Sequence, residues 1–431
     1  MLVSKKVHIL AALIGIVSLT FVPIDYNFQI VQAEDIINNS ESAELKSELN
    51  QPDNEILAEQ KLEEGLTLCS QNNYQDAISK YDEALKLIPT SAAAYYNRGI
   101  AYTHLKKYVN AISDFNNAIG INPSNAEFYI NCGNVYFDLE NYELAVEDYT
   151  KAIDLNPIDY KTYNRRGKAH RALKNYLQAF KDCTKAVEIS PSYFEAYNNR
   201  GAVYADLEIY DQAIVDYNMA LEFNADYAEA YNNRGAAYVE LQDYELAIND
   251  YNKALELKPD FAEAFNGRGN AYYRLKKYDL AVADFTKAVE LNPNADLAYN
   301  NRGAAHFELK KYAQAVNDYT KAIQLNPSAD LAYYNRGFAY YYLENYTQAF
   351  KDYTKAIELN PNNAEAFNGR GNVYYCLKEY EQAINEYNKT IELKPQFADA
   401  YYWRGMCYQE LGDNVHSQTD IAKARALGYK D

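Results

Sequence analysis

Residues 296–329 read DLAYNNRGAAHFELKKYAQAVNDYTKAIQLNPSA, and this 34-residue phrase decides the fold because it recurs along most of the chain. From Ala58 to Asp431 it is written eleven times without an insertion or a deletion. One glycine therefore recurs in step, at Gly65, Gly99, Gly133, Gly167, Gly201, Gly235, Gly269, Gly303, Gly337, Gly371 and Gly405. A unit this short cannot bury an apolar face alone and must stack on its neighbours. The sequence predicts a solenoid with a long surface for contact.

Small residues and prolines keep the same register as the glycine. Alanine recurs twelve residues after it, as in Ala315, and again seven residues further on, as in Ala322. Small side chains let two helices approach closely, while Tyr or Phe rings fill the gaps. A proline near the end of nine units stops the second helix, and Ala225 replaces it in the fifth unit. The pattern predicts antiparallel helix pairs.

These residues resemble the tetratricopeptide repeat family, whose helix-turn-helix unit has the same length and the same Gly, Tyr, Ala, Phe, Ala and Pro. The resemblance implies an all-α tetratricopeptide-repeat solenoid, a right-handed superhelix of antiparallel helix pairs. The first and last units depart from the pattern at Leu68, Ser417 and Ile421, as capping repeats do. The repeats are expected at 58–91, 92–125, 126–159, 160–193, 194–227, 228–261, 262–295, 296–329, 330–363, 364–397 and 398–431.

The chain begins with features of an export signal. Lys5 and Lys6 precede an apolar run, and small residues end at Ala33, so residues 1–33 read as a cleaved secretory signal peptide. The run lies near the lower length limit of a membrane span, so an uncleaved anchor is the alternative. Residues 34–57 read as an acidic flexible linker into the first helix. We expect a periplasmic, lumenal or extracellular protein, with membrane contact only if the signal stays uncleaved.

The net charge and the cysteines limit which partners, disulfides and metal sites can be expected. The net charge of −18 disfavours nucleic acid, whose phosphates an acidic surface repels. The five cysteines lie in different repeats and form no disulfide or metal-binding pattern. Cys376 and Cys407 lie on first helices of adjacent repeats, which permits one disulfide. The sequence predicts no metal and no cofactor.

Catalytic motifs are not found in the sequence. His170 and His306 replace the aromatic residue three positions after a glycine and are interpreted as packing residues. The carboxylates recur with the repeat instead of converging on a pocket. We therefore expect no catalytic residues and no enzyme.

An arginine precedes the glycine in nine repeats, and an acid often follows it by sixteen residues, as in Arg234 and Asp250. The first repeat reverses the charges to Glu64 and Lys80, which favours a salt bridge between helices over an arginine-lined ligand site.

Asparagines are the first candidates for partner binding. In the resembled family the first helices line the inner face, and asparagine recurs there two residues before the glycine, at Asn97, Asn131, Asn199, Asn233, Asn301 and Asn335. A second set lies one residue earlier, as in Asn164, Asn266 and Asn300. A carboxamide both donates and accepts hydrogen bonds, so such a ladder can hold the backbone of an extended peptide. The alternative is that these residues stabilise turns of packed helices or are simply solvated.

Basic residues form a second candidate site in the fourth repeat. Lys161, Arg165 and Lys168 share one helical face, with Arg171 nearby. Asn131, Lys161 and Arg165 match three registers of the carboxylate clamp of chaperone-binding members of the family, but Tyr96 and Ile100 replace its other two residues. The stripe is either an anion-binding site or a solvated helix face.

Aromatic residues outside the framework registers gather on the last three first helices, and they are Tyr334, Phe338, Tyr341, Tyr342, Tyr375, Tyr402 and Trp403. They suit a protein hot spot or stacking against sugar rings. Packing of the C-terminal cap is the alternative.

The leading prediction is an exported, non-enzymatic scaffold or adaptor that binds protein segments, as extended peptide or helix, in its groove. The alternative function is envelope-polysaccharide assembly or export, through binding of glycan or of glycan-handling proteins.

Overall fold

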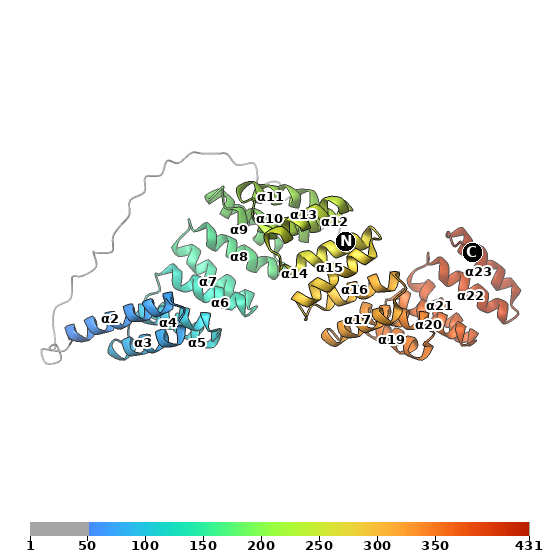
Figure 1. Cartoon of the computed structure of the whole chain (residues 1–431), viewed down its shortest axis with the longest axis horizontal. Helices are drawn as coiled ribbons and strands as arrows, with labels where there is room; N and C mark the ends of the chain where they lie inside the picture. The colour runs from blue at the N-terminus through green and yellow to red at the C-terminus, as the bar shows by residue number, and fades with distance from the viewer. Residues whose placement is uncertain (1–50, 431) are drawn as a thin grey trace. The chain divides into compact units, whose positions relative to one another are not determined.

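The computed structural model describes residues 51–430, with side chains from Asn54 onward, and every regular element in that range is an α-helix (Figure 1). The predicted signal peptide, residues 1–33, lies outside the described residues, as does most of the linker. The first helix begins at Gln51, ahead of the expected start of the first repeat at Ala58.

Each repeat is a pair of helices, called here the first and the second helix. The first helices are α2 (Gln51–Ser70), α4 (Ala92–His104), α6 (Ala126–Asp138), α8 (Tyr160–Ala172), α10 (Phe194–Asp206), α12 (Ala228–Glu240), α14 (Ala262–Arg274), α16 (Asp296–Glu308), α18 (Asp330–Tyr342), α20 (Ala364–Cys376) and α22 (Ala398–Glu410). The second helices are α3 (Tyr74–Leu87), α5 (Tyr108–Ile121), α7 (Tyr142–Leu155), α9 (Tyr176–Ile189), α11 (Tyr210–Phe223), α13 (Tyr244–Leu257), α15 (Tyr278–Leu291), α17 (Tyr312–Leu325), α19 (Tyr346–Leu359), α21 (Tyr380–Leu393) and α23 (Asn414–Ala426).

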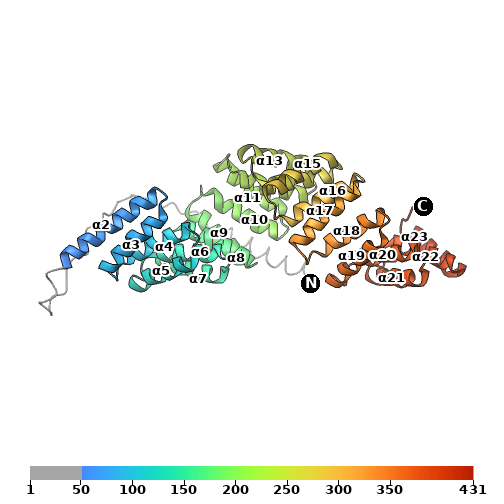
Figure 2. The same cartoon turned by 60° about the horizontal axis from the view of Figure 1, so that its bottom comes forward.

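The array divides into two compact units, of which the first ends at Ala225 and the second begins at Asp226. The sequence predicts one unbroken array, and the division falls at the one repeat end where alanine replaces proline. Within each unit every helix packs on the helix before it and the helix after it (Figure 2). First helices also contact the first helices of the next repeats, as α8 does α10 and α18 does α20. The first helices of a unit thus line one side of its stack of helix pairs, which we call the first-helix face.

The turn inside each repeat uses a left-handed residue. Lys106 has φ 56°, and its N–H donates to the Thr103 carbonyl while the N–H of Lys107 donates to Tyr102. This pair of bonds is a Schellman motif, which satisfies carbonyls at the helix end. Tyr108, two residues after Lys106, is the first residue of the second helix.

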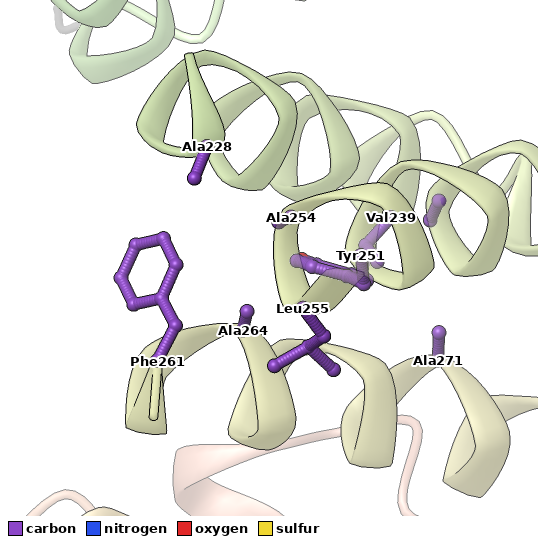
Figure 3. Close-up of a cluster of buried hydrophobic side chains, with 9 residues drawn as sticks. Ala228, Val239, Tyr251, Ala254, Leu255, Phe261, Ala264 and Ala271 are labelled. Carbon is purple, nitrogen blue, oxygen red and sulfur yellow. The ribbon is translucent and has the colours of Figure 1, made fainter. Parts of the chain in front are cut away.

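The core consists of alanines and rings between helices. In the second unit, Tyr251 of α13 packs among Ala247, Ala254 and Ala271, all of them almost completely buried (Figure 3). The register glycine is required by the ring sixteen residues later. A Cβ added at Gly303 would lie 2.7 Å from a ring carbon of Tyr319. Real Cβ atoms do not approach this closely, so the helices can meet here only at glycine.

The predicted salt bridge is present, and the arginine also reaches a second partner. Arg302 binds Asp318 through two nitrogens, with Nη2 at 2.6 Å from Oδ1. Its Nη1 donates to Thr286 Oγ1 on the second helix of the preceding repeat, at 3.3 Å. The same double contact recurs at Arg98, Arg166, Arg268, Arg336, Arg370 and Arg404. The arginine therefore links the two helices of its own repeat and also links that repeat to the preceding one.

The reversed pair of the first repeat is also formed, with Lys80 Nζ at 2.9 Å from Glu64 Oε2. Opposite charge is thus kept where the residue types are exchanged, which supports the structural interpretation of the register.

Candidate functional site

Asparagines of neighbouring first helices are hydrogen-bonded to one another. The Nδ2 of Asn301 donates to Asn266 Oδ1 at 3.2 Å, and the Nδ2 of Asn335 donates to Asn300 Oδ1 at 3.1 Å. In the first unit Asn199 donates to Asn164 in the same way, at 2.8 Å. Each bond joins residues 35 positions apart, so it connects adjacent repeats. The two asparagine registers therefore form pairs, which the sequence did not predict.

These asparagine pairs keep unused polar atoms. Among the described residues, Asn301 Oδ1 and Asn266 Nδ2 have no hydrogen-bond partner, and Asn301 and Asn266 are both half-buried. A carboxamide has two acceptor and two donor positions, so one bond leaves others to use. The pairing fixes the orientation of the side chains and presents the remaining atoms on the first-helix face.

The other predicted asparagines differ in their bonding. Asn97 donates to the carbonyl of Ala93 within its own helix, and Asn131 donates to Tyr96 Oη at 3.0 Å. Asn233 accepts a hydrogen bond from Asn232 at 3.3 Å. The ladder is thus interrupted, and its regular part in the second unit runs from Asn266 to Asn335.

The predicted basic stripe lies on α8. Lys161 is exposed and lies over the ring of Tyr160, while Lys168 is exposed and lies 5.3 Å from the centre of the Phe137 ring. Arg171 forms an ion pair with Asp206, with Nε 2.7 Å from Oδ2. Among residues 54–430, no carboxylate lies within ion-pair distance of Arg165 or Lys168.

Arg165 and Lys168 line a pocket of about 210 Å³ together with residues that the sequence analysis did not single out. The other lining residues are Asn134, Phe137, Asp138 and Tyr149, from the preceding repeat. Burial raises the pKa of Tyr149, and the nearby charge of Arg165 opposes that rise. The two walls of the pocket come from neighbouring repeats, with residues such as Asn134 and Lys168 about one repeat length apart in the sequence. That spacing is the signal from which the pocket could have been predicted.

The C-terminal aromatic residues pack mainly on one another and on the core. Phe338 stacks on Phe307 with ring centres 4.9 Å apart, and Tyr334 and Tyr341 lie against the cluster around Tyr353. Tyr375 contacts Trp403, and Tyr402 stacks on Tyr429. Of the predicted aromatic residues, Tyr342 is the exposed one, with 49% of its surface accessible. The packing interpretation accounts for most of this group.

Cys376 and Cys407 are free thiols in the structure. Cys376 Sγ lies 3.4 Å from Tyr341 Oη, whereas Cys407 is buried with Tyr387 and Ala400. The disulfide that the sequence permits is therefore not formed.

The two histidines at the aromatic register are half-buried beside salt-bridged acids. His306 Nε2 lies 3.7 Å from Asp318, and His170 Nε2 lies 4.0 Å from Asp182. Burial lowers the pKa of both histidines, which favours their neutral form. In the described part of the chain, no group of His, Cys, Asp and Glu residues is arranged to hold a metal ion. No described helix has the length and apolar character needed to cross a bilayer.

Tandem helix pairs joined by repeated contacts between neighbours define the class of helical repeat scaffolds. The chain belongs to the tetratricopeptide repeat family. Models described as tetratricopeptide repeat or TPR repeat match it at 65–106, 92–125, 126–159, 160–193, 206–242, 237–276, 262–295, 297–329, 331–363, 352–385 and 371–412. No curated protein matches the chain significantly.

Solved structures with a similar arrangement share little sequence with it. One is described as an APC/C hetero-tetramer, Cut9-Hcn1, with 16% identity, a TM-score of 0.49, and 87% of this chain and 88% of that chain covered. Another is YrrB, described as a TPR protein with an unusual peptide-binding site, with 28% identity, a TM-score of 0.37, and 43% and 95% covered. A third is MamA, with 26% identity, a TM-score of 0.35, and 37% and 93% covered.

Proposed function

We propose that this protein is an exported, non-enzymatic scaffold that holds segments of other proteins against its first-helix face. The observation that carries the proposal is the asparagine pairing in the second unit. Bonds such as that between Asn301 and Asn266 fix the carboxamides and leave donors and acceptors directed at no other described residue. An extended peptide needs such partners, because its backbone N–H and C=O groups lose water when they are covered.

The chemistry of the face suits reversible binding. Leu297 and Leu331 are 67% and 54% exposed, and each lies one helical turn before a predicted asparagine, Asn301 or Asn335. Residues four positions apart share a helical face, so these leucines extend the surface that the asparagine pairs occupy. Carboxamides that bind a backbone and leucines that contact side chains together allow many sequences to bind with moderate affinity. A scaffold of the tetratricopeptide repeat family is expected to work in this way.

Export is supported by the sequence of residues 1–33. Its direct test is N-terminal sequencing of the protein recovered from its own host. A chain that begins at Glu34 supports export with cleavage, whereas a chain that keeps Met1 and stays in the soluble cytoplasmic fraction overturns this part of the proposal.

Peptide binding is tested by selecting from a random peptide library with the full-length mature chain. The affinity of the recovered peptides is then measured on the double variant Asn301→Ala/Asn335→Ala. We expect about thirtyfold weaker binding, from the loss of two hydrogen bonds worth about 1 kcal/mol each. Asn317→Ala is the matched control, because Asn317 is exposed on the second helix α17. Failure to recover any peptide contradicts the proposed function.

The polysaccharide alternative loses its main support. It rests on the C-terminal aromatic residues, and most of these rings are occupied by packing contacts such as that between Tyr375 and Trp403. A ring that is already stacked within the protein is not available to stack on a sugar.

A further inference from the structure

Two adjoining pockets lie on the first-helix face where α6, α8 and α10 follow one another. The first is the pocket of about 210 Å³ that Arg165 and Lys168 line. The second has a volume of about 380 Å³ and is lined by Phe137, Lys168, Arg171, Ala172, Lys174, Tyr176 and Asp206. Phe137 and Lys168 belong to both, so the two pockets share a wall.

Hydrogen-bond donors converge on the first pocket. Tyr149 Oη donates to Asn134 Oδ1 at 2.9 Å, which fixes the carboxamide and leaves its Nδ2 without a partner among the described residues. Arg165 and Lys168 are three positions apart on one helix and therefore project side by side. An amide, a guanidinium and an ammonium group thus face one small space, which is the donor set that an oxyanion requires.

The charges select a carboxylate over a phosphoryl group. Arg165 and Lys168 contribute two positive charges and Asp138 one negative charge, so the pocket has a net charge of +1. A single carboxylate balances this charge. A phosphoryl group carries close to two negative charges at pH 7 and would face repulsion from Asp138.

The surroundings specify what lies beside that carboxylate in the partner. The repeats before and after the fourth have an acid at the position that Lys161 occupies in the fourth. These acids are Glu127 and Glu195. Glu127 is exposed and Glu195 is partly exposed, and neither acid forms an ion pair within residues 54–430. An acidic tail would be repelled by these carboxylates, whereas basic residues would pair with them.

We propose that repeats three to five bind an internal segment of a partner protein in which one Asp or Glu side chain is flanked by basic residues. The acidic side chain occupies the pocket of Asn134, Arg165 and Lys168, and the flanking basic residues pair with Glu127, Asp138 or Glu195. This inference rests on the proposed function and specifies the chemistry of one of its partners.

The test is a comparison of random-peptide selections on two forms of the full-length mature chain, the wild type and Arg165→Gln/Lys168→Gln. We expect a class of peptides with a central acid between basic residues to be enriched on the wild type and lost on the variant. For a peptide of this class, fluorescence anisotropy should show at least tenfold weaker binding when its Glu is changed to Gln, or when the protein carries the two substitutions. Lys181→Gln is the matched control, because Lys181 is exposed on the second helix α9 of the same repeat.

Each outcome distinguishes this inference from the proposed function. Enriched peptides without an acid, or peptides whose affinity is the same on the variant, overturn the pocket and leave peptide binding intact. Enrichment of phosphopeptides over their Glu counterparts, tested with synthetic pairs, overturns the choice of carboxylate. A selection that enriches nothing contradicts both proposals. As a folding control, the melting temperature of Arg165→Gln/Lys168→Gln is compared with that of the wild type. Equal values show that the variant is folded and that the substitutions weaken binding at the pocket itself.

Discussion

The Asp148 carboxylate lies beside the Cys132 thiol, at the position where the acids of nine other repeats meet an arginine. Asp148 Oδ2 is buried and has no hydrogen-bond partner. Burial raises the pKa of Asp148 to about 6 and raises that of the Cys132 thiol as well. The third repeat therefore lacks both its internal salt bridge and the arginine contact to the preceding second helix.

Introducing the missing arginine should stabilise the first unit. In Cys132→Arg the guanidinium can follow the path of Arg166, which binds Asp182 and Thr150. We expect the free energy of unfolding to rise by about 1 kcal/mol, because a buried acid gains a partner. Urea unfolding followed by circular dichroism measures this, with Cys132→Leu as the control that adds volume without charge. An arginine variant no more stable than the leucine variant would show that Asp148 needs no partner.

Asp148 should also make stability depend on pH. Its folded-state pKa of about 6 lies above the ordinary value of 3.8, so the folded state binds the proton more readily than the unfolded state. The ionised form therefore destabilises the fold above pH 6, and this cost is relieved as pH falls from 6 to 4. Asp148→Asn should be more stable than the wild type by about 1 kcal/mol at pH 7, a value reduced for partial exposure. The difference should vanish near pH 4. A constant difference across this window would exclude titration of Asp148 as its cause.

Replacing only one partner of the repeated salt bridge should lower the stability of the protein strongly. Asp250 accepts two hydrogen bonds from Arg234 at 2.7 Å and is 6% exposed. Asp250→Lys should lower the free energy of unfolding by about 3 kcal/mol, because it buries two like charges together. Adding Arg234→Glu should recover part of the loss, as the natural pair of Glu64 and Lys80 indicates. In contrast, Glu256→Lys reverses one charge of an exposed pair and should change stability by less than about 0.5 kcal/mol.

A glycine at the recurring register and a glycine elsewhere in a repeat should respond to alanine with stability changes of opposite sign. Gly303→Ala places a methyl group 2.7 Å from the Tyr319 ring and should cost about 1–3 kcal/mol. Gly120 lies in helix α5 with nothing within 4 Å of its added Cβ, so Gly120→Ala should stabilise by about 0.5–1 kcal/mol. Thermal unfolding of the two variants separates the effects, and equal shifts for both would contradict the close approach at Gly303.

The helix pairs and the salt bridge of Arg302 with Asp318 could be predicted from the sequence, because both are set by spacing within one repeat. The contact of Arg302 with Thr286 could not, since other repeats have Asp or Asn at that register and the partner belongs to the preceding unit. The asparagine pairs and the pocket at Arg165 depend on how repeats stack, which the spacing within one repeat does not determine. The aromatic group was ambiguous because rings that pack and rings that bind look alike in a sequence.

The most direct test of binding on the first-helix face is hydrogen–deuterium exchange of the mature chain with and without a peptide selected on it. Binding should protect the backbone amides of first helices such as α14, α16 and α18 and leave the exposed sides of α15 and α17 unchanged. Protection confined to the second helices would contradict the account.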